Sequence, residues 1–157
     1  MDLQCLYNFL EPFLIGYAPL FPNSRPETSG YPCLTYKQLS DLPDVLLSGT
    51  LAGTSSARIQ IDIFSEDHSV SNTIAKVIRA ALCGYSGVMG LYLSGLTSAQ
   101  LNNLTQQQLA VMPIFGSSIW IITVILNDDV ENPNSAADAG DNWVYQRSLD
   151  FQIRYAE

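Results

Sequence analysis

The chain has 157 residues, of which 47% are hydrophobic, so it is long and apolar enough to form one domain with its own core. Fifteen acidic side chains against seven basic ones give a net charge of −8. This charge disfavours direct binding to nucleic-acid phosphates and to anionic membrane surfaces. The three cysteines, Cys5, Cys33 and Cys83, are odd in number and lack metal-ligand spacing, which predicts buried thiols in a reducing compartment.

No stretch has the pattern of a secretory signal or a membrane span. The N-terminal stretch MDLQCLYNFLEPFLIG is apolar, but no basic residue precedes its apolar part. The longest apolar run, Ile119 to Leu126, is too short to cross a bilayer. We therefore expect a soluble protein that is intracellular where it is made.

The first predicted element is an amphipathic helix near the N-terminus. Its apolar residues fall on one helical face: Leu3, Leu6, Tyr7, Leu10 and Leu14. Pro12 is expected to end or kink this helix near Glu11. The following stretch, GYAPLFPNSRPETSGYP, contains four prolines and predicts an extended connection over the surface.

Strands are predicted next. Residues 33–36 favour a short strand, Pro43 indicates a turn, and residues 46–51 favour another short strand before a turn at GTSS. In ARIQIDIFS the β-branched residues Ile59, Ile61 and Ile63 alternate with polar ones. This period of two is a strong strand signal.

A helix is predicted directly after this strand. Asp67 is suited to cap its first turn, and Gly84 stands where a C-terminal cap belongs. Between them one apolar stripe recurs at helical spacing: Ile74, Val77, Ile78, Ala81 and Leu82.

The region from Ala80 to Asn127 contains no charged residue. It includes the polar stretch TSAQLNNLTQQQLAVMP, a candidate short helix capped by Thr97 or Ser98, and the apolar strand SIWIITVIL. Charge is the usual guard against association, so an uncharged surface of this length indicates a protein that associates.

An acidic segment, residues 127–142, follows this strand. It holds five carboxylates without a basic residue: Asp128, Asp129, Glu131, Asp138 and Asp141. We expect a solvated, mobile loop that joins two strands as an elongated hairpin. The second of those strands lies in YQRSLDFQIRYAE, where apolar and polar residues alternate.

Catalytic chemistry has few candidates. His68 is the only histidine, and a nucleophile Cys33 or Cys83 with Asp62 or Asp67 to orient the ring would be needed beside it. No glycine-flanked nucleophile motif surrounds either cysteine, and Cys83 is expected in the core at the end of the apolar stripe. His68, beside a helix cap, is expected to be an ordinary surface residue.

Ligand-binding motifs are equally weak. Asp128, Asp129 and Glu131 lack the alternation and terminal glutamate of a calcium loop. The glycines of GYSGVMG follow a helix and lack the lysine of a phosphate loop. We therefore expect no catalytic residue, no cofactor and no metal, and an interaction role for the acidic residues.

The order of these elements resembles the tail-completion, or tail-terminator, proteins of tailed bacteriophages and related prophage elements. The strand pattern R-[IV]-Q-[IV]-D-[IVF] is matched by Arg58, Gln60 and Asp62. The helix pattern A-x-x-[IV]-x-x-A-[IL] and the ending LDFxIRY are matched by Ala75, Ile78, Leu82, Asp150, Phe151 and Tyr155. Residues 84–116 depart from the family, which usually has a shorter link there.

The resemblance implies a single α+β domain over residues 1–157. A small, mainly antiparallel four-stranded sheet would pack with two helices and carry a long hairpin loop. The family forms a ring, usually a hexamer, that caps the tail tube, joins it to the head connector and lets DNA pass through its lumen. The implied location is the tail or neck of a virion made in the cytoplasm of a host bacterium, with no membrane involved.

Two alternatives stay open at this point. Another phage neck, connector or tail-tube subunit would show much the same pattern. A small cysteine–histidine hydrolase that uses His68 belongs to a different class and would not form a ring of defined multiplicity.

Overall fold

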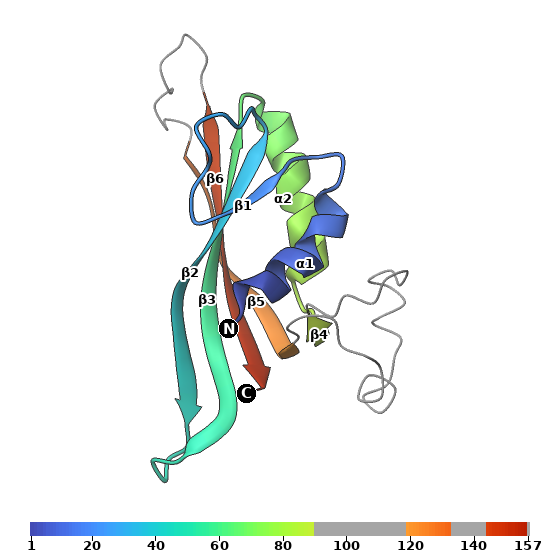
Figure 1. The fold of residues 1–157 in the computed structure, drawn as a ribbon. Helices are drawn as coiled ribbons and strands as arrows, with labels where there is room; N and C mark the ends of the chain where they lie inside the picture. The colour runs from blue at the N-terminus through green and yellow to red at the C-terminus, as the bar shows by residue number, and fades with distance from the viewer. Residues whose placement is uncertain (90–118, 133–143, 157) are drawn as a thin grey trace.

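The computed structural model describes residues 1–89, 119–132 and 144–156. Two helices lie on the same side of one sheet (Figure 1). The elements in chain order are α1 (Leu3–Leu14), β1 (Leu20–Pro22), β2 (Cys33–Val45), β3 (Leu51–Ser65), α2 (His68–Leu82), β4 (Gly87–Met89), β5 (Ile119–Asn132) and β6 (Tyr145–Ala156).

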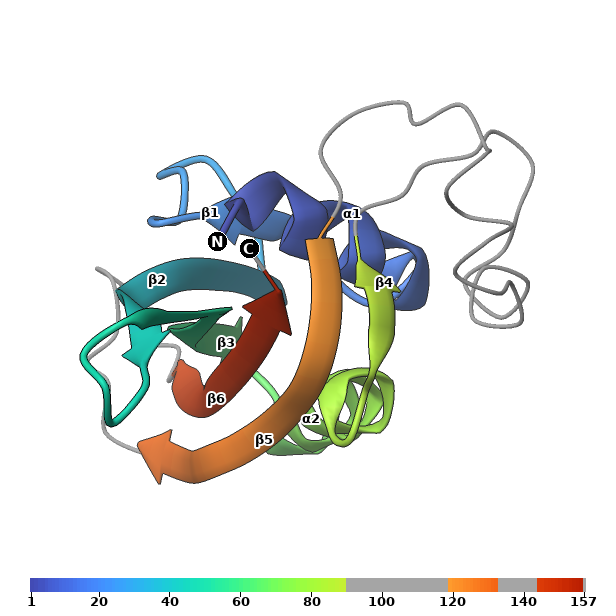
Figure 2. The ribbon, with the colours of Figure 1, turned by 90° about the horizontal axis from the view of Figure 1, so that it is seen from below.

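The sheet has six strands in the order β1-β2-β3-β6-β5-β4 and is strongly curled (Figure 2). β1 runs parallel to β2, and the other neighbours are antiparallel. The expected four-stranded sheet is therefore wrong, although the two helices expected to pack with it are present. The candidate short helix capped by Thr97 or Ser98 lies outside the described residues. The two additional strands, β1 and β4, are only three residues long. A three-residue strand forms because it can pair with a neighbouring strand. Three residues are too few to show an alternation of apolar and polar side chains in the sequence.

Helix α1 begins at the cap residue Asp2, whose side chain accepts a hydrogen bond from the backbone N–H of Gln4 at 2.9 Å. The helix continues through Pro12, and the N–H of Ile15 still bonds to the carbonyl of Glu11 at 3.1 Å. The expected end near Glu11 is wrong. Proline removes one backbone donor, and the burial of Leu14 two residues later favours the continued helix.

The β2–β3 hairpin is longer than the sequence indicates. β2 runs through Pro43 with register shifts between Gln38 and Ser40 and between Pro43 and Val45. The turn lies at residues 46–50, where the N–H of Leu46 bonds to the carbonyl of Thr50 at 2.9 Å. The expected turns at Pro43 and GTSS are therefore wrong. Proline is tolerated in an edge strand beside an irregularity, because no ladder bond needs its N–H there.

Helix α2 agrees with its prediction. The Asp67 side chain accepts from the N–H of Ser69 at 2.7 Å, and Gly84 has the left-handed φ of +72° that suits a residue beyond a helix end. Three residues of its predicted stripe, Ile74, Ile78 and Leu82, are buried in the core, Ala81 packs against the core, and Val77 is only half-buried. Alternate residues of the central strands complete this core, namely Ile59, Ile61, Ile63, Leu149, Phe151 and Ile153. The prediction for the β3 strand is likewise confirmed.

β5 extends further than its apolar residues suggest. It runs to Asn132 and pairs with β6 along its whole length, so that Asp129 lies opposite Leu149 and Glu131 opposite Arg147. The prediction of a loop from Asn127 onward is wrong for residues 127–132, and residues 133–143 lie outside the described part. The prediction that this strand and the last one form a hairpin is confirmed.

Candidate assembly interfaces

Asp129 lies at the junction of α2, β5 and β6. Its carboxylate accepts hydrogen bonds from Nε and Nη2 of Arg147 at 2.6 and 2.9 Å, and from Nη1 of Arg79 at 2.5 Å. The hydrogen bond and charge of Arg147, helped by the charge of Arg79, lower the pKa of Asp129 below its ordinary value of 3.8, and partial burial opposes this. Asp129 therefore joins three elements of its own chain.

His68 takes part in the same junction. Its Nε2 accepts a hydrogen bond from the side-chain amide of Asn72 at 2.7 Å, so Nδ1 carries the proton and donates to the Glu131 carboxylate. The ring also meets the edge of Tyr145, with 5.9 Å between centroids. These contacts explain the histidine at the strand-to-helix junction as a structural link between α2 and β5.

Neither cysteine fits the hydrolase alternative. Cys83 lies at the other end of α2, about 22 Å from His68 for a helix of this length. It is exposed, so its expected place in the core is wrong. Cys33 is buried, and burial raises its pKa above the ordinary 9.0, the opposite of an activated thiolate. The two aspartates proposed to orient the ring have other contacts: Asp67 caps α2 and Asp62 bonds to Ser148 and Gln60.

The acidic residues singled out in the sequence have different places. Asp128 is exposed on β5, whereas Asp129 and Glu131 contact Arg147, Arg79 and His68. The expectation that they lack local basic partners is therefore wrong for these two. Asp138 and Asp141 lie outside the described residues. An interface role for the five remains a prediction.

The sheet face opposite the helices is polar and carries matched charges. Nε of Arg58 donates to both carboxylate oxygens of Asp150, at 3.0 and 2.8 Å. Lys37 lies 3.7 Å from Asp62, and Nε of Arg154 donates to Asp44 at 2.8 Å. A hollow of about 420 Å³ on this face is lined by residues of four strands, Asp44, Ser56, Thr123, Ile125, Gln152 and Arg154.

Two long stretches of the sheet have no strand beside them among the described residues. β1 pairs only with residues 34–36 of β2, which leaves residues 37–45 as an edge. β4 pairs only with residues 119–121 of β5, which leaves residues 122–132 without a neighbouring strand on that side, although the N–H of Gly84 bonds to the carbonyl of Val124 at 3.0 Å. Such edges are templates for pairing with another chain.

The tip of the β2–β3 hairpin is the most exposed apolar part of the described chain. It presents large aliphatic side chains that are each more than half exposed, namely Leu42, Val45, Leu46, Leu47 and Leu51. Sequence reasoning missed this surface by taking these residues as short strand pieces. The signal was available, because the run DLPDVLLSGTL places leucines around a glycine turn where polar residues are usual.

Neither described helix is long and apolar enough to span a membrane. No cluster of metal-ligating side chains is present among the described residues.

Comparison with solved structures finds chains with a similar fold. A chain in the virion of a native gene transfer agent (GTA) particle has a similar fold. Its TM-score with the present structure is 0.50 and its sequence identity is 12%, and the match covers 99% of this chain and 95% of that chain. No family model matches the sequence, and no curated protein matches it. The likeness therefore rests on the fold, which is shared across nearly the whole of both chains.

Proposed function

We propose that this chain is a structural subunit of a virion or phage-like particle. The observation that carries the proposal is the fold shared over 99% of the chain with a protein of the gene transfer agent virion. The site geometry supports it, because His68 and the β5 residues Asp129 and Glu131 link elements of the fold. A structural role requires surface complementarity and symmetry and does not require catalytic residues.

Within such a particle, we propose that the chain forms a ring that caps the tail tube and joins it to the head connector. The two sheet edges support ring formation. β2 and β5 run in opposite directions, because each neighbouring pair from β2 through β3 and β6 to β5 is antiparallel. Rotation about a ring axis that runs along the strands preserves their polarity, so the β5 edge of one copy would meet the β2 edge of the next as an antiparallel pair.

The polar face of the sheet suits a lumen through which DNA passes. Its cations, Lys37, Arg58 and Arg154, are each matched by an aspartate, and the chain as a whole carries eight net negative charges. Paired cations bind phosphates weakly, since the phosphate would have to displace the aspartate already there. DNA would therefore slide along this face without being held.

Two measurements test the proposal. Mass photometry and negative-stain imaging of the purified chain, alone and with tail tubes, should show a ring of one defined multiplicity located at a tube end. Labelling of the chain in particles from the organism that encodes it should place the label at the junction of head and tail. Rings stacked into long tubes would indicate a tail-tube subunit, and a chain that is monomeric in every mixture and absent from the particles would refute the proposal.

A further inference from the structure

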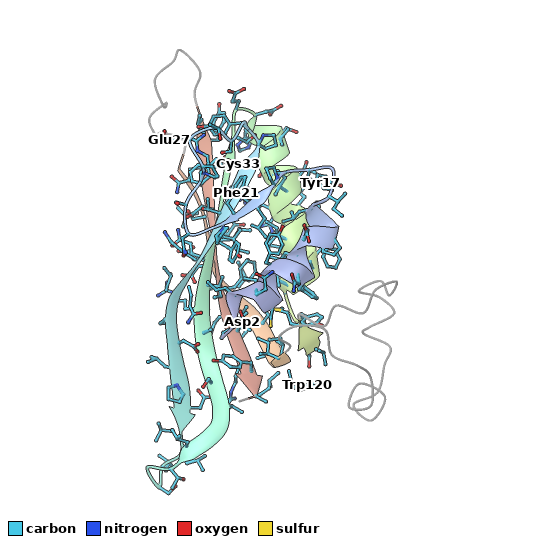
Figure 3. All side chains as sticks on the ribbon, in the orientation of Figure 1. Asp2, Tyr17, Phe21, Glu27, Cys33 and Trp120 are labelled. Carbon is cyan, nitrogen blue, oxygen red and sulfur yellow. The ribbon has the colours of Figure 1, made fainter. Side chains whose placement is uncertain are left out.

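Each edge of the sheet carries a three-residue strand, and these two short strands lie at opposite ends of the molecule. β1 lies on the β2 edge beside residues 34–36, and β4 lies on the β5 edge beside residues 119–121. Figure 3 labels Phe21 of β1 toward the upper end of the sheet and Trp120, which pairs with β4, toward the lower end. Both edges are therefore stepped, because each edge is one strand wider at one end than at the other.

The pairing registers show which residues lie at the same height along the strands. Hydrogen bonds between neighbouring strands run across the strand direction, so residues that pair in succession form a row across the sheet. Three rows begin on β1 and end on β5, and their end residues are Leu20 and Glu131, Phe21 and Val130, and Pro22 and Asp129. β1 is therefore level with a part of the β5 edge that has no strand beside it among the described residues.

The short strand at the lower end matches the opposite edge in the same way. The row of Gly87 in β4 crosses the sheet and reaches β2 at Pro43. β1 stops well before this row, so residues 43–45 of β2 have no strand on their outer side in the described part of the chain. The upper rows cross β1-β2-β3-β6-β5 and the lower row crosses β2-β3-β6-β5-β4. The sheet is therefore five strands wide at both heights, with an offset of one strand.

We propose that neighbouring copies in the ring meet through these steps. β1 of one copy pairs with residues 129–131 of β5 in the next copy, and β4 of that next copy lies beside residues 43–45 of the first copy's β2. This inference rests on the proposed ring and specifies how its edges meet. Rotation about an axis along the strands preserves height, so a single rotation brings both joints to one strand spacing, about 4.8 Å.

Strand direction is compatible with the upper joint. β1 runs parallel to β2, and β2 runs opposite to β5. β1 therefore meets β5 of the next copy as an antiparallel strand, which is the polarity that the proposed ring gives to these two edges. In this arrangement β1 and β4 fill the space between the longer strands β2 and β5 of adjacent copies.

The middle row of the upper joint places two apolar side chains together. Phe21 follows the buried Leu20 on β1, so its side chain lies on the opposite, polar face of the sheet, where it is only partly covered. Val130 is 49% exposed, and its partner Ser148 bonds to Asp62 on the same polar face. The joint would place Phe21 beside Val130 of the next copy. An aromatic residue opposite a β-branched residue is a stabilising cross-strand pair.

A second copy is the occupant that these edges indicate. Each edge has its additional strand at the height where the other edge lacks one, and both edges belong to the same chain. A strand from an unrelated protein could cover one edge, but it would leave the other edge uncovered. Head-to-tail contacts between copies cover both edges of every copy once the ring closes.

A disulfide between copies tests the upper joint. The variant carries Phe21→Cys and Val130→Cys, together with Cys83→Ser to remove the exposed native thiol. β1 and β5 of one chain are four strand spacings apart, roughly 19 Å along the sheet, so the bond can form only between copies. Mild oxidation of the assembled protein should give a series of covalent oligomers that ends at the ring's multiplicity and disappears on reduction.

A variant shifted by two residues is the matched control. It carries Phe21→Cys and Asp128→Cys in the same Cys83→Ser background. Asp128 is exposed on the same face of β5 as Val130, and in the proposed register its Cα lies diagonally from that of Phe21, at about 7 to 8 Å. A disulfide needs Cα atoms within about 6.8 Å, so this variant should give little covalent product.

A second measurement leaves Phe21 unchanged and compares Val130→Lys with Thr73→Lys in sedimentation velocity. A lysine on a sheet edge opposes pairing with another strand, so we expect Val130→Lys to weaken self-association at least about tenfold. Its melting temperature should stay that of the native chain, because Val130 is half exposed in the single chain. Thr73→Lys adds the same charge on the exposed side of α2 and should associate like the native chain.

The outcomes separate this joint from the ring itself. Normal rings from Val130→Lys, without covalent oligomers from the Phe21→Cys and Val130→Cys variant, would overturn the joint and leave the ring intact. Equal covalent product from the shifted control would show another register and also overturn it. If Phe21→Cys prevents folding, the result for Val130→Lys decides alone. A native chain that never associates would refute the ring and the joint together.

Discussion

At the scale of single residues, the Asp129 carboxylate lies between the guanidinium groups of Arg147 and Arg79. Asp129→Asn should lower the free energy of unfolding by about 2 to 4 kcal/mol, because it leaves two partly buried cations without their anion. Urea denaturation measures this loss. Asp128→Asn is the matched control. That carboxylate is exposed and accepts a hydrogen bond from the neighbouring N–H of Asp129 at 2.8 Å, so its loss should change stability by less than about 0.5 kcal/mol. An equal loss of unfolding free energy in the two variants would contradict the ion-pair junction.

The lowered pKa of Asp129 gives this junction a pH dependence. A carboxyl group whose pKa is lower in the folded chain than in the unfolded chain stabilises the fold at pH values above its unfolded-state pKa, which is here near 3.8. That contribution is lost as the pH falls through the lower folded value. The stability difference between the native chain and Asp129→Asn should therefore be constant above about pH 5 and shrink below about pH 4. A difference that persists unchanged in acid would show that the charge is not its cause.

His68 makes its side-chain contacts to Glu131, Asn72 and Tyr145 of its own chain. We expect His68→Ala to cost about 1 kcal/mol of stability and to leave ring assembly unchanged, since a half-exposed hydrogen-bonded pair contributes little. Counting infectious or DNA-carrying particles made with the variant checks this. Loss of assembly in a variant that folds normally would restore a functional role for the histidine.

At the scale of elements, α2 is held by the burial of one stripe. Ile78 is fully buried, so Ile78→Asp should destabilise the chain by several kcal/mol, because an unpaired charge enters the core. Thr73→Asp adds the same charge to the exposed side of the same helix and should alter stability by less than about 0.5 kcal/mol. Thermal melting of both variants distinguishes them, and a native-like Ile78→Asp would mean that the stripe does not face the sheet.

At the scale of the whole molecule, net charge and apolar contacts act against each other in assembly. Copies that each carry eight negative charges repel one another, and salt screens that repulsion. Apolar contacts between copies are not weakened by screening. Self-association measured by sedimentation should therefore strengthen between about 0.05 and 0.5 M NaCl, where the Debye length falls from about 14 to about 4 Å. Dissociation over this range would indicate an interface made of ion pairs.

Elements with a local residue pattern can be predicted from the sequence alone. The alternation of Ile59, Ile61 and Ile63 and the stripe through Ile74 and Ile78 report which face is buried. When one side of a strand or helix is buried, apolar residues recur at the spacing of that strand or helix. This spacing can be recognised without knowing which element packs against the buried side. The capping roles of Asp67 and Gly84 were readable for the same reason, since a cap acts on its own first or last turn.

Only the tertiary structure decided the features that depend on residues far apart in the chain. The acidic end of β5 is a strand because Asp129 meets Arg79, 50 residues away, and Arg147 across the hairpin. β1 and β4 exist through pairing with strands already in place, and β2 passes Pro43 because that stretch is an edge. The exposure of Leu47 follows from the β2–β3 hairpin reaching past its neighbouring strand β6, and Ile15 is exposed as the residue that follows α1. These features depend on strand pairing and charge pairing between residues far apart in the chain, and such pairing produces no regular spacing of residue types in the sequence.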